Sequence, residues 1–273
     1  MKEHKNKVVL ITGSSSGIGK AAVNFFATKE WCVAATMRNP KKEPDYKKGS
    51  NVKVFKLDVT DRAEIEQCIK DVMNTFGKID VVVNNAGYGL IGPLELGTVK
   101  QVKKQMDTNV IGLINVTQLI IPYFREQKEG RIINISSIAG KVALPFHSFY
   151  NATKFAVEGL SESLSYELKP FNIKVKLIEP GAIKTRFYDE SLESIKVGNI
   201  KEYDNHMANS LTKIHEFGRN GSGPEEVAKA IFTAAVDQGN RLRYAVGGGA
   251  PFLLFLKRIT PAPLFRSMIR KFL

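Results

Sequence analysis

Residues 8–19, with the sequence VVLITGSSSGIG, join a short apolar run to a glycine-rich turn and then to a helical pattern. Glycine lets a backbone turn sharply and come close to a bound group, and the first turn of a helix offers unpaired N–H groups at the positive end of the helix dipole. Such a junction suits a pyrophosphate. The spacing of Gly13, Gly17 and Gly19 differs from the common GxGxxG fingerprint. The junction therefore indicates nucleotide binding only together with the rest of the chain.

Apolar, β-branched runs alternate with amphipathic stretches along the chain. Several runs are so continuously apolar that both faces of the sheet must be covered. We expect strands at 8–12, 32–36, 52–57, 79–83, 131–135, 175–178 and 243–246, and helices at 18–27, 63–76, 110–124, 150–168 and 224–236. This alternation predicts an α/β fold: one Rossmann-type domain over residues 1–273, with a doubly wound parallel sheet of about seven strands and helices on both faces.

Composition narrows the class of protein. The chain has 273 residues, is 43% hydrophobic and 25% charged, and carries a net charge of +13, which excludes a disordered or collagen-like chain. Cys32 and Cys68 suit a reducing, cytoplasmic compartment and lack partners at metal-ligand spacing, so no metal site is expected. We find no apolar run of about 18 residues and no signal core before the first strand. The basic residues follow no nucleic-acid-binding pattern, so no nucleic acid partner is expected.

The end of the second predicted strand indicates which dinucleotide binds. An Asp or Glu about 20 residues after the glycines favours the ribose 2′-hydroxyl of NAD. This chain has Thr36-Met37-Arg38-Asn39 there, with no carboxylate. A guanidinium pairs with a 2′-phosphate, whereas an acid repels it. Arg38 is either a solvated loop cation or a phosphate ligand, and the missing acid favours NADP, with NADPH preferred over NADH.

Tyr150 and Lys154 stand at i and i+4 of a predicted helix and so share one face. A phenol with a pKa of about 10 is a poor acid or base near neutral pH, and a neighbouring ammonium lowers that pKa. Such pairs are also common by chance. Upstream, Ser136 and Ser137 end a predicted strand at the edge where parallel sheets bind ligands, although a turn or cap role also explains them.

Together these pieces resemble the short-chain dehydrogenase/reductase family. The matching motifs, in family order and spacing, are TGSSSGIG at 12–19, Asn84-Asn85-Ala86-Gly87, Asn109, Ser137, Tyr150 with Lys154, and Pro180-Gly181. The resemblance is strong over residues 7–190. It implies an oxidoreductase that reduces a carbonyl, or oxidises the matching alcohol, with a nicotinamide cofactor.

The resemblance implies a role for each matching residue. Tyr150 would be the general acid or base, and Ser137 would bind the substrate oxygen. Lys154 would bind the nicotinamide ribose and lower the pKa of Tyr150, while Asn109 would hold a relay water. The implied cofactor-binding residues are Gly13, Ser15, Ser16, Gly17, Ile18, Gly19, Arg38, Asp58, Val59, Asn85, Ala86, Gly87, Tyr150, Lys154, Pro180, Gly181, Ile183 and Thr185.

Further details resemble the branch that contains 17-beta-hydroxysteroid and retinol dehydrogenases. They are residues 35–40, Tyr88-Gly89 and the stretch 154–160. The branch mostly prefers NADPH, and it favours a bulky apolar carbonyl substrate. The pocket residues expected from their place in the chain are Val142, Ala143, His147, Phe187 and Tyr188, although a structural role explains His147 more simply.

Two segments break the alternation. Residues 182–222 are polar, contain glycines and show little periodicity, and we expect them to form a substrate lid. Residues 251–273 are an amphipathic C-terminal extension. Its last six large apolar residues form one helical stripe, with Arg266, Arg270 and Lys271 opposite: Leu264, Phe265, Met268, Ile269, Phe272 and Leu273. The stripe suits packing on the domain or on a second subunit, or peripheral contact with an anionic membrane.

Three functions fit the sequence: an NADPH-dependent reductase of a small-molecule carbonyl, a non-catalytic dinucleotide sensor, and a membrane-surface protein. The complete catalytic set of Asn109, Ser137, Tyr150 and Lys154 favours the reductase. The resemblance also implies a homodimer or homotetramer formed through the helices expected at 110–124 and 150–168.

Overall fold

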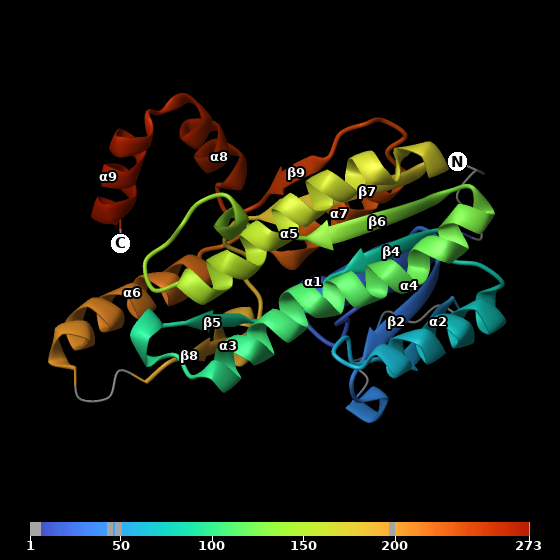
Figure 1. Ribbon diagram of the computed structural model, residues 1–273, viewed down its shortest axis with the longest axis horizontal. Helices are drawn as coiled ribbons and strands as arrows, with labels where there is room; N and C mark the ends of the chain where they lie inside the picture. Colours follow the sequence, from blue (N-terminus) through green and yellow to red (C-terminus); the bar gives the residue numbers. More distant parts are fainter. Residues whose placement is uncertain (1–6, 43–45, 47–50, 197–199, 273) are drawn as a thin grey trace.

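A seven-stranded parallel sheet forms the centre of the protein, in the order β3-β2-β1-β4-β6-β7-β9 (Figure 1). The computed structural model describes residues 7–42, 46, 51–196 and 200–272. The strands of this sheet are β1 (Val8–Ile11), β2 (Cys32–Met37), β3 (Val52–Lys56), β4 (Val81–Asn84), β6 (Gly130–Ile135), β7 (Ile173–Pro180) and β9 (Arg243–Val246). The Rossmann-type single-domain fold expected from the sequence is confirmed.

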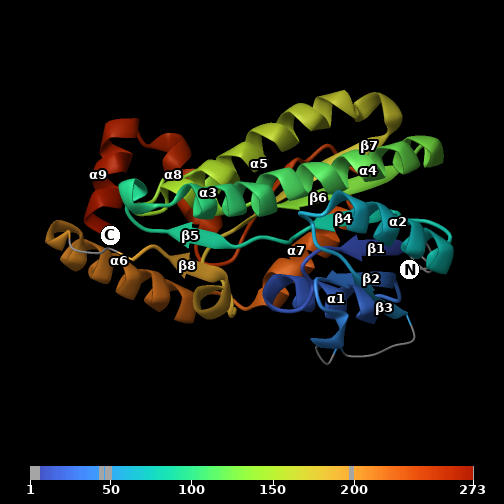
Figure 2. The ribbon, with the colours of Figure 1, turned by 60° about the horizontal axis from the view of Figure 1, so that its bottom comes forward.

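The helices cover both faces of the sheet. They are α1 (Gly17–Thr28), α2 (Arg62–Phe76), α3 (Val99–Met106), α4 (Gly112–Gln127), α5 (Ser148–Glu167), α6 (Lys201–Arg219), α7 (Pro224–Val236), α8 (Ala250–Ile259) and α9 (Ala262–Phe272). A π-turn at Asp107–Ile111 joins α3 to α4, and short helical turns lie at Pro40–Lys42, Leu94–Leu96, Ile138–Gly140, Lys169–Phe171 and Phe187–Ser191. Figure 2 shows α4 and α5 on one side of the sheet and α1 and α7 on the other.

Alternate strand residues enter two separate cores, which explains why a central strand such as β1 is apolar at every position. In β1, Val9 and Ile11 pack with α1 and α7, whereas Val8 and Leu10 pack with α2, α4 and α5. All four side chains are buried. Because side chains of a strand alternate between faces, a sheet covered on both sides requires apolar residues at every position.

The strand order reverses between β1 and β4, which are neighbours in the sheet. Parallel α/β sheets bind ligands in the crevice that this reversal opens at the carboxyl ends of the strands. A small second sheet, β5 (Gly89–Ile91) paired with β8 (Leu192–Ser194), lies beyond those ends. Helices α6, α8 and α9 lie on the same side of the molecule (Figure 1).

Residues 182–222 contain α6, a 19-residue helix that the sequence analysis did not identify. Met207 and Ile214 are buried there and pack with Ile91 of β5. Their spacing, with Leu211 between them, gives the apolar stripe of an amphipathic helix. Among the described residues, no helix is both long and apolar enough to cross a bilayer.

Candidate active site

The turn between β1 and α1 is held by the segment that follows β4. The Thr12 hydroxyl oxygen accepts hydrogen bonds from the backbone N–H groups of Asn85 and Ala86, both at 3.0 Å. The Asn85 side-chain amide donates to the carbonyls of Thr12 and Gly13, both at 2.9 Å. These bonds fix the glycine turn against the neighbouring strand end before any ligand arrives.

Backbone geometry explains the three glycines of this turn. Gly13 and Gly17 have φ angles of +64° and +53°, in the left-handed region that favours glycine. A Cβ on Gly19 would lie 2.4 Å from the Gly13 carbonyl oxygen and 2.6 Å from the Asn85 amide nitrogen. The helix can therefore approach the turn only with glycine at position 19.

The N-terminus of α1 keeps its N–H groups available. Ser16 stands at the N-cap, yet its side chain makes no capping hydrogen bond, and the first turn contains no acidic residue. Ser15 is exposed and Ile18 is half-buried. An uncapped, acid-free helix N-terminus beside a glycine turn fits a pyrophosphate, both in its hydrogen-bond donors and in the sign of the helix dipole.

The residues expected around the adenosine lie at the ends of β2 and β3. Arg38 follows β2, is exposed, and makes no ion pair with the described residues. Asp58 accepts hydrogen bonds from the Thr60 N–H at 2.9 Å and its hydroxyl at 2.7 Å. Val59 is buried against Gly112. An exposed guanidinium at the end of β2, with no acid at the end of that strand, fits a ribose 2′-phosphate.

The segment after β7 forms the opposite wall. Ile183 is buried and pairs with Ser222, which ties residues 182–184 to the chain that follows α6. A Cβ on Gly17 would lie 3.5 Å from that of Thr185, so this segment and the glycine turn face each other closely. The predicted contacts at Pro180, Gly181, Ile183 and Thr185 therefore lie on one continuous wall next to the α1 N-terminus.

Tyr150 and Lys154 lie on one face of α5, as the i, i+4 spacing predicts. Lys154 is buried, and its Nζ atom donates to the Ile135 carbonyl at 2.8 Å and lies 5.7 Å from the centroid of the Tyr150 ring. Ile135 is the last residue of β6, so the ammonium is anchored at the carboxyl edge of the sheet. Tyr150 is half-buried beside it.

Burial dominates the pKa values of both groups. It raises the pKa of the Tyr150 phenol, with the hydrogen bond to the Ser137 hydroxyl opposing the shift. It lowers the pKa of Lys154 to about 8, with the carboxylate of Glu158 opposing. The net pKa of Tyr150 is therefore raised, and the lowering by Lys154 that the resemblance implies stays a prediction. The cause of the rise is desolvation, which disfavours both the phenolate and the ammonium.

Ser137 and Asn109 complete the group around Tyr150. Ser137 follows β6, and its hydroxyl accepts the Ala139 N–H at 3.1 Å. Asn109 lies in the π-turn between α3 and α4 and is buried. Its amide donates to the Tyr88 carbonyl at 2.8 Å and to the Thr153 hydroxyl at 3.2 Å. Asn109 thus links the strand end after β4 to α5, and π-turns often occur at functional sites.

Aromatic rings surround Tyr150 on the side of the predicted lid. The Phe187 ring centroid lies 6.0 Å from that of Tyr150 and 5.6 Å from that of Tyr188. His147 is buried, its ring centroid lies 6.5 Å from that of Tyr150, and its Nδ1 lies 2.7 Å from the Pro145 carbonyl oxygen. Burial lowers the pKa of His147, which favours a neutral, structural ring.

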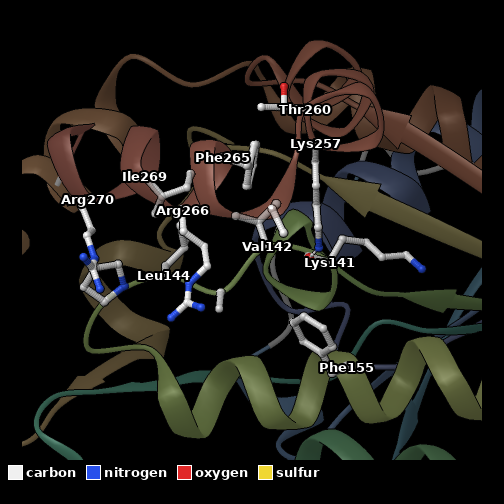
Figure 3. A pocket seen from close by; sticks show the side chains of 13 residues that line it. Lys141, Val142, Leu144, Phe155, Lys257, Thr260, Phe265, Arg266, Ile269 and Arg270 are labelled. Carbon is white, nitrogen blue, oxygen red and sulfur yellow. Dashed lines mark hydrogen bonds between the residues drawn. The ribbon is translucent and has the colours of Figure 1, made fainter.

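Val142 lies apart from this aromatic group. It is buried and lines a cavity of about 560 Å³ between the loop at 141–145, α5 and the C-terminal helices (Figure 3). Ala143 lines the same cavity. The structure thus brings Phe187, Tyr188 and His147 together around Tyr150 and places Val142 on a neighbouring cavity.

The sequence analysis missed a buried amide network behind the site. The Asn84 amide donates to the Asn134 side-chain oxygen at 2.9 Å, and the Asn134 amide donates to the Ser161 hydroxyl at 2.8 Å. These bonds connect β4, β6 and α5. The sequence feature that could have revealed this network is an asparagine within an apolar strand, because a buried polar side chain needs a hydrogen-bond partner.

A cluster of buried charges, also missed, lies beneath Lys154. The Glu158 carboxylate is 3.0 Å from the Arg243 Nε and 3.3 Å from the Lys141 Nζ, and Glu179 is 3.5 Å from the same Arg243 nitrogen. Glu158 and Glu179 are both only 3% exposed. Burial, together with the nearby charge of Glu158, raises the pKa of Glu179 well above its usual range.

This shift predicts a pH-dependent effect of Glu179→Gln on stability. Because the folded protein binds the Glu179 proton more tightly than the unfolded chain, the stabilisation is complete below the unfolded pKa of about 4.3 and is lost as pH rises. Glutamine at position 179 does not titrate. The unfolding free energy of the variant minus that of wild type should therefore increase by about 1–3 kcal/mol from about pH 5 to pH 8. Urea unfolding at both pH values measures this, with the exposed Glu126→Gln as control. Equal pH profiles for wild type and Glu179→Gln would contradict the assignment.

Comparison with known proteins agrees with this geometry. A family model described as short chain dehydrogenase matches residues 7–196. A 3-ketodihydrosphingosine reductase from Bacteroides thetaiotaomicron is 37% identical over 88% of each chain, and retinol dehydrogenase 8 from Bos taurus is 31% identical over 94% of this chain and 86% of its own. The solved structure of ElxO with NADP bound superposes with a TM-score of 0.71 at 29% identity, covering 90% of this chain and 99% of ElxO. The chain belongs to the short-chain dehydrogenase family of oxidoreductases, which act on CH–OH and C=O groups.

Proposed function

We propose that the protein is an NADP(H)-dependent carbonyl reductase in which Tyr150 is the general acid. The observation that carries this proposal is the placement of the Tyr150 phenol between Ser137 and Lys154 at the carboxyl edge of the sheet. The bound cofactor would supply the hydride. The Tyr150 phenol is protonated at neutral pH, which is the form that donates a proton. The raised pKa makes it a weaker acid, but the alkoxide that forms as the hydride is transferred is a stronger base than a phenolate, so proton donation remains favourable.

The neighbouring residues have distinct roles in this proposal. The Ser137 hydroxyl donates a hydrogen bond to the substrate oxygen and stabilises the negative charge that develops there. Lys154 binds the nicotinamide ribose, and its pKa of about 8 lets it exchange a proton near neutral pH. Asn109 positions Tyr88 and Thr153 and supports the relay that restores the phenol proton.

The cofactor preference rests on Arg38, and ElxO, a relative of known structure, has NADP bound. We expect Arg38→Asp to lower the ratio of kcat/KM for NADPH to that for NADH by about 100-fold, because one charge-assisted contact is lost and a like charge faces the phosphate. Steady-state kinetics with both cofactors measures this ratio. The exposed Lys169→Asp makes the same charge change far from the cleft and should leave the ratio unchanged. An unchanged ratio for Arg38→Asp would remove Arg38 from the cofactor site.

A bulky apolar carbonyl compound is the substrate class we propose. The ring of Phe187 packs against Tyr150 and Tyr188 packs against Phe187, and two relatives described above are named for 3-ketodihydrosphingosine and for retinol. The test measures the rate of NADPH oxidation with a series of ketones of increasing apolar size, which begins with short aliphatic ketones. Activity that rises with apolar size supports this class, and activity confined to the small polar members contradicts it.

The homodimer or homotetramer that the resemblance implies remains a prediction. Phe155 and Tyr166 of α5 are 44% and 68% exposed, which provides apolar surface on one of the helices expected to mediate it. Size-exclusion chromatography with light scattering measures the molar mass directly.

A further inference from the structure

The last two helices, α8 and α9, form a pair at the carboxyl-end side of the molecule, which we name the C-terminal helix pair (residues 250–272). It lies at one corner of the molecule in Figures 1 and 2. Thr260 and Pro261 separate the two helices. Neither helix, at 10 and 11 residues, is long enough to span a bilayer.

One side of each helix faces the body of the protein. The cavity above α5 is lined by Lys257 of α8, by Thr260 between the helices, and by Phe265 and Ile269 of α9 (Figure 3). Phe265 is buried, and the Lys257 ammonium donates to the Lys141 carbonyl. These contacts hold the pair on the domain and fix which sides of the two helices remain outside.

The stripe expected from the sequence is divided by this arrangement. Phe265 and Ile269 face the cavity, whereas Leu264 and Met268 are 57% and 40% exposed. Arg266 lines the same cavity as Phe265. The domain thus covers only the part of the stripe nearest the loop at 141–145.

The outer side of α8 is also apolar. Phe252, Phe255 and Ile259 are 71%, 59% and 60% exposed, and their i, i+3, i+7 spacing places them on one face of the helix. Helical spacing puts this face opposite Lys257, which lines the cavity. Together with Leu264 and Met268 of α9, these residues give the pair an outer surface with five large unburied apolar side chains.

The charge of this segment has one sign. From residue 250 to the last residue there is no Asp or Glu, while the cations are Lys257, Arg258, Arg266, Arg270 and Lys271. Arg258 is exposed on α8, and Arg266 and Arg270, which line the cavity beside Phe265 and Ile269, are exposed on α9. Arg266 and Arg270 form no ion pair with the described residues. Apolar side chains beside uncompensated arginines characterise helices that lie in the headgroup region of anionic membranes.

We propose that the C-terminal helix pair docks the protein on the surface of a bilayer that contains anionic phospholipids. The outer apolar side chains enter the acyl boundary, and the arginines bind the phosphate groups above it. A second copy of the chain is a poorer occupant, because a two-fold contact through this surface brings like charges together. An acidic protein would satisfy the arginines but does not account for apolar side chains spread along both helices.

The test is flotation of the full-length protein with large vesicles, made of phosphatidylcholine alone or with phosphatidylglycerol, at about 0.1 M and about 1 M salt. We expect binding to the mixed vesicles at low salt, weaker binding at high salt, and little binding to phosphatidylcholine alone.

The pair Phe252→Ser and Phe255→Ser should lower the vesicle partition coefficient at least tenfold. The matched control pair, Tyr166→Ser and Phe171→Ser, removes two exposed aromatic rings elsewhere and should bind as wild type does.

A charge variant tests the other half of the proposal. Arg258→Gln, Arg266→Gln and Arg270→Gln together should remove the dependence on phosphatidylglycerol. The control of equal charge change is Lys100→Gln, Arg125→Gln and Lys169→Gln at other exposed positions. Fluorescence titration with NADPH shows that every variant is folded.

Three outcomes would overturn the proposal. Wild-type protein remains unbound with the mixed vesicles, or the helix-pair variants bind as well as their controls. In the third outcome, wild type does not bind vesicles, and the Phe252→Ser and Phe255→Ser pair converts an oligomer in solution to a smaller species. The outer surface would then be a subunit interface. Each readout is independent of turnover, so failure of the proposed reductase activity would not affect this test.

Discussion

Tyr150→Phe is expected to reduce kcat/KM for carbonyl reduction by about 10³-fold or more while NADPH binding stays within about twofold of wild type. The change removes one hydroxyl, and the ring contacts with Phe187 and His147 remain. The substrate oxygen then lacks its proton donor, and the remaining groups, Ser137 and Lys154, cannot supply that proton in the same position. Steady-state kinetics on the best ketone and a fluorescence titration with NADPH measure the two quantities.

Tyr166→Phe is the matched control, because it removes a phenol oxygen from the exposed side of the same helix. It should leave both quantities unchanged. Turnover by Tyr150→Phe at more than about a tenth of the wild-type rate would show that another group, or water, donates the proton.

Gly19→Ala is the second change with a large expected effect. The added Cβ would lie 2.4 Å from the Gly13 carbonyl oxygen and 2.6 Å from the Asn85 amide, so the turn, the helix or the strand end must move. Because Asn85 holds the turn through two hydrogen bonds, that movement disturbs the whole pyrophosphate site. We expect NADPH affinity to fall at least tenfold and the unfolding free energy to fall by about 2–4 kcal/mol.

Gly159→Ala separates this steric effect from the general effect of a Gly-to-Ala change in a helix. Gly159 is exposed in α5, and its added Cβ would meet no atom within 4 Å. Alanine favours a helix by about 1 kcal/mol relative to glycine, so this control should be as stable as wild type or more so. Normal NADPH affinity in Gly19→Ala would show that the α1 turn does not bind the cofactor.

The seven strands of the main sheet could be predicted from the sequence because both faces of that sheet are covered. Short runs such as Val8–Ile11 and Val81–Val83 are apolar at every position, a pattern that favours strands buried on both faces. Tyr150 and Lys154 lie on one face of α5 as expected, since their i, i+4 spacing already fixes that common face.

Features that depend on contacts between distant segments could not be predicted in the same way. The side of the C-terminal stripe that is buried depends on the position of the loop at 141–145, which no local pattern reports. The pKa of Tyr150 depends on how deeply the fold buries the phenol, which the i, i+4 spacing does not report. Glu158 of α5 and Glu179 of β7 both contact Arg243 of β9, which is distant from them in sequence. Helix α6 could have been predicted, because its apolar stripe of Met207, Leu211 and Ile214 is present in the sequence itself.

Isotope transfer is the measurement that tests the central claim most directly. The protein is incubated with NADPH that carries deuterium at the reactive C4 position and with the most active ketone of the size series, and the alcohol product is analysed by mass spectrometry. The account predicts one deuterium on the carbinol carbon with wild type, and product below detection in the same time with Tyr150→Phe. Tight NADPH binding with no deuterium transferred to any ketone or aldehyde would contradict it and would identify the protein as a dinucleotide-binding sensor.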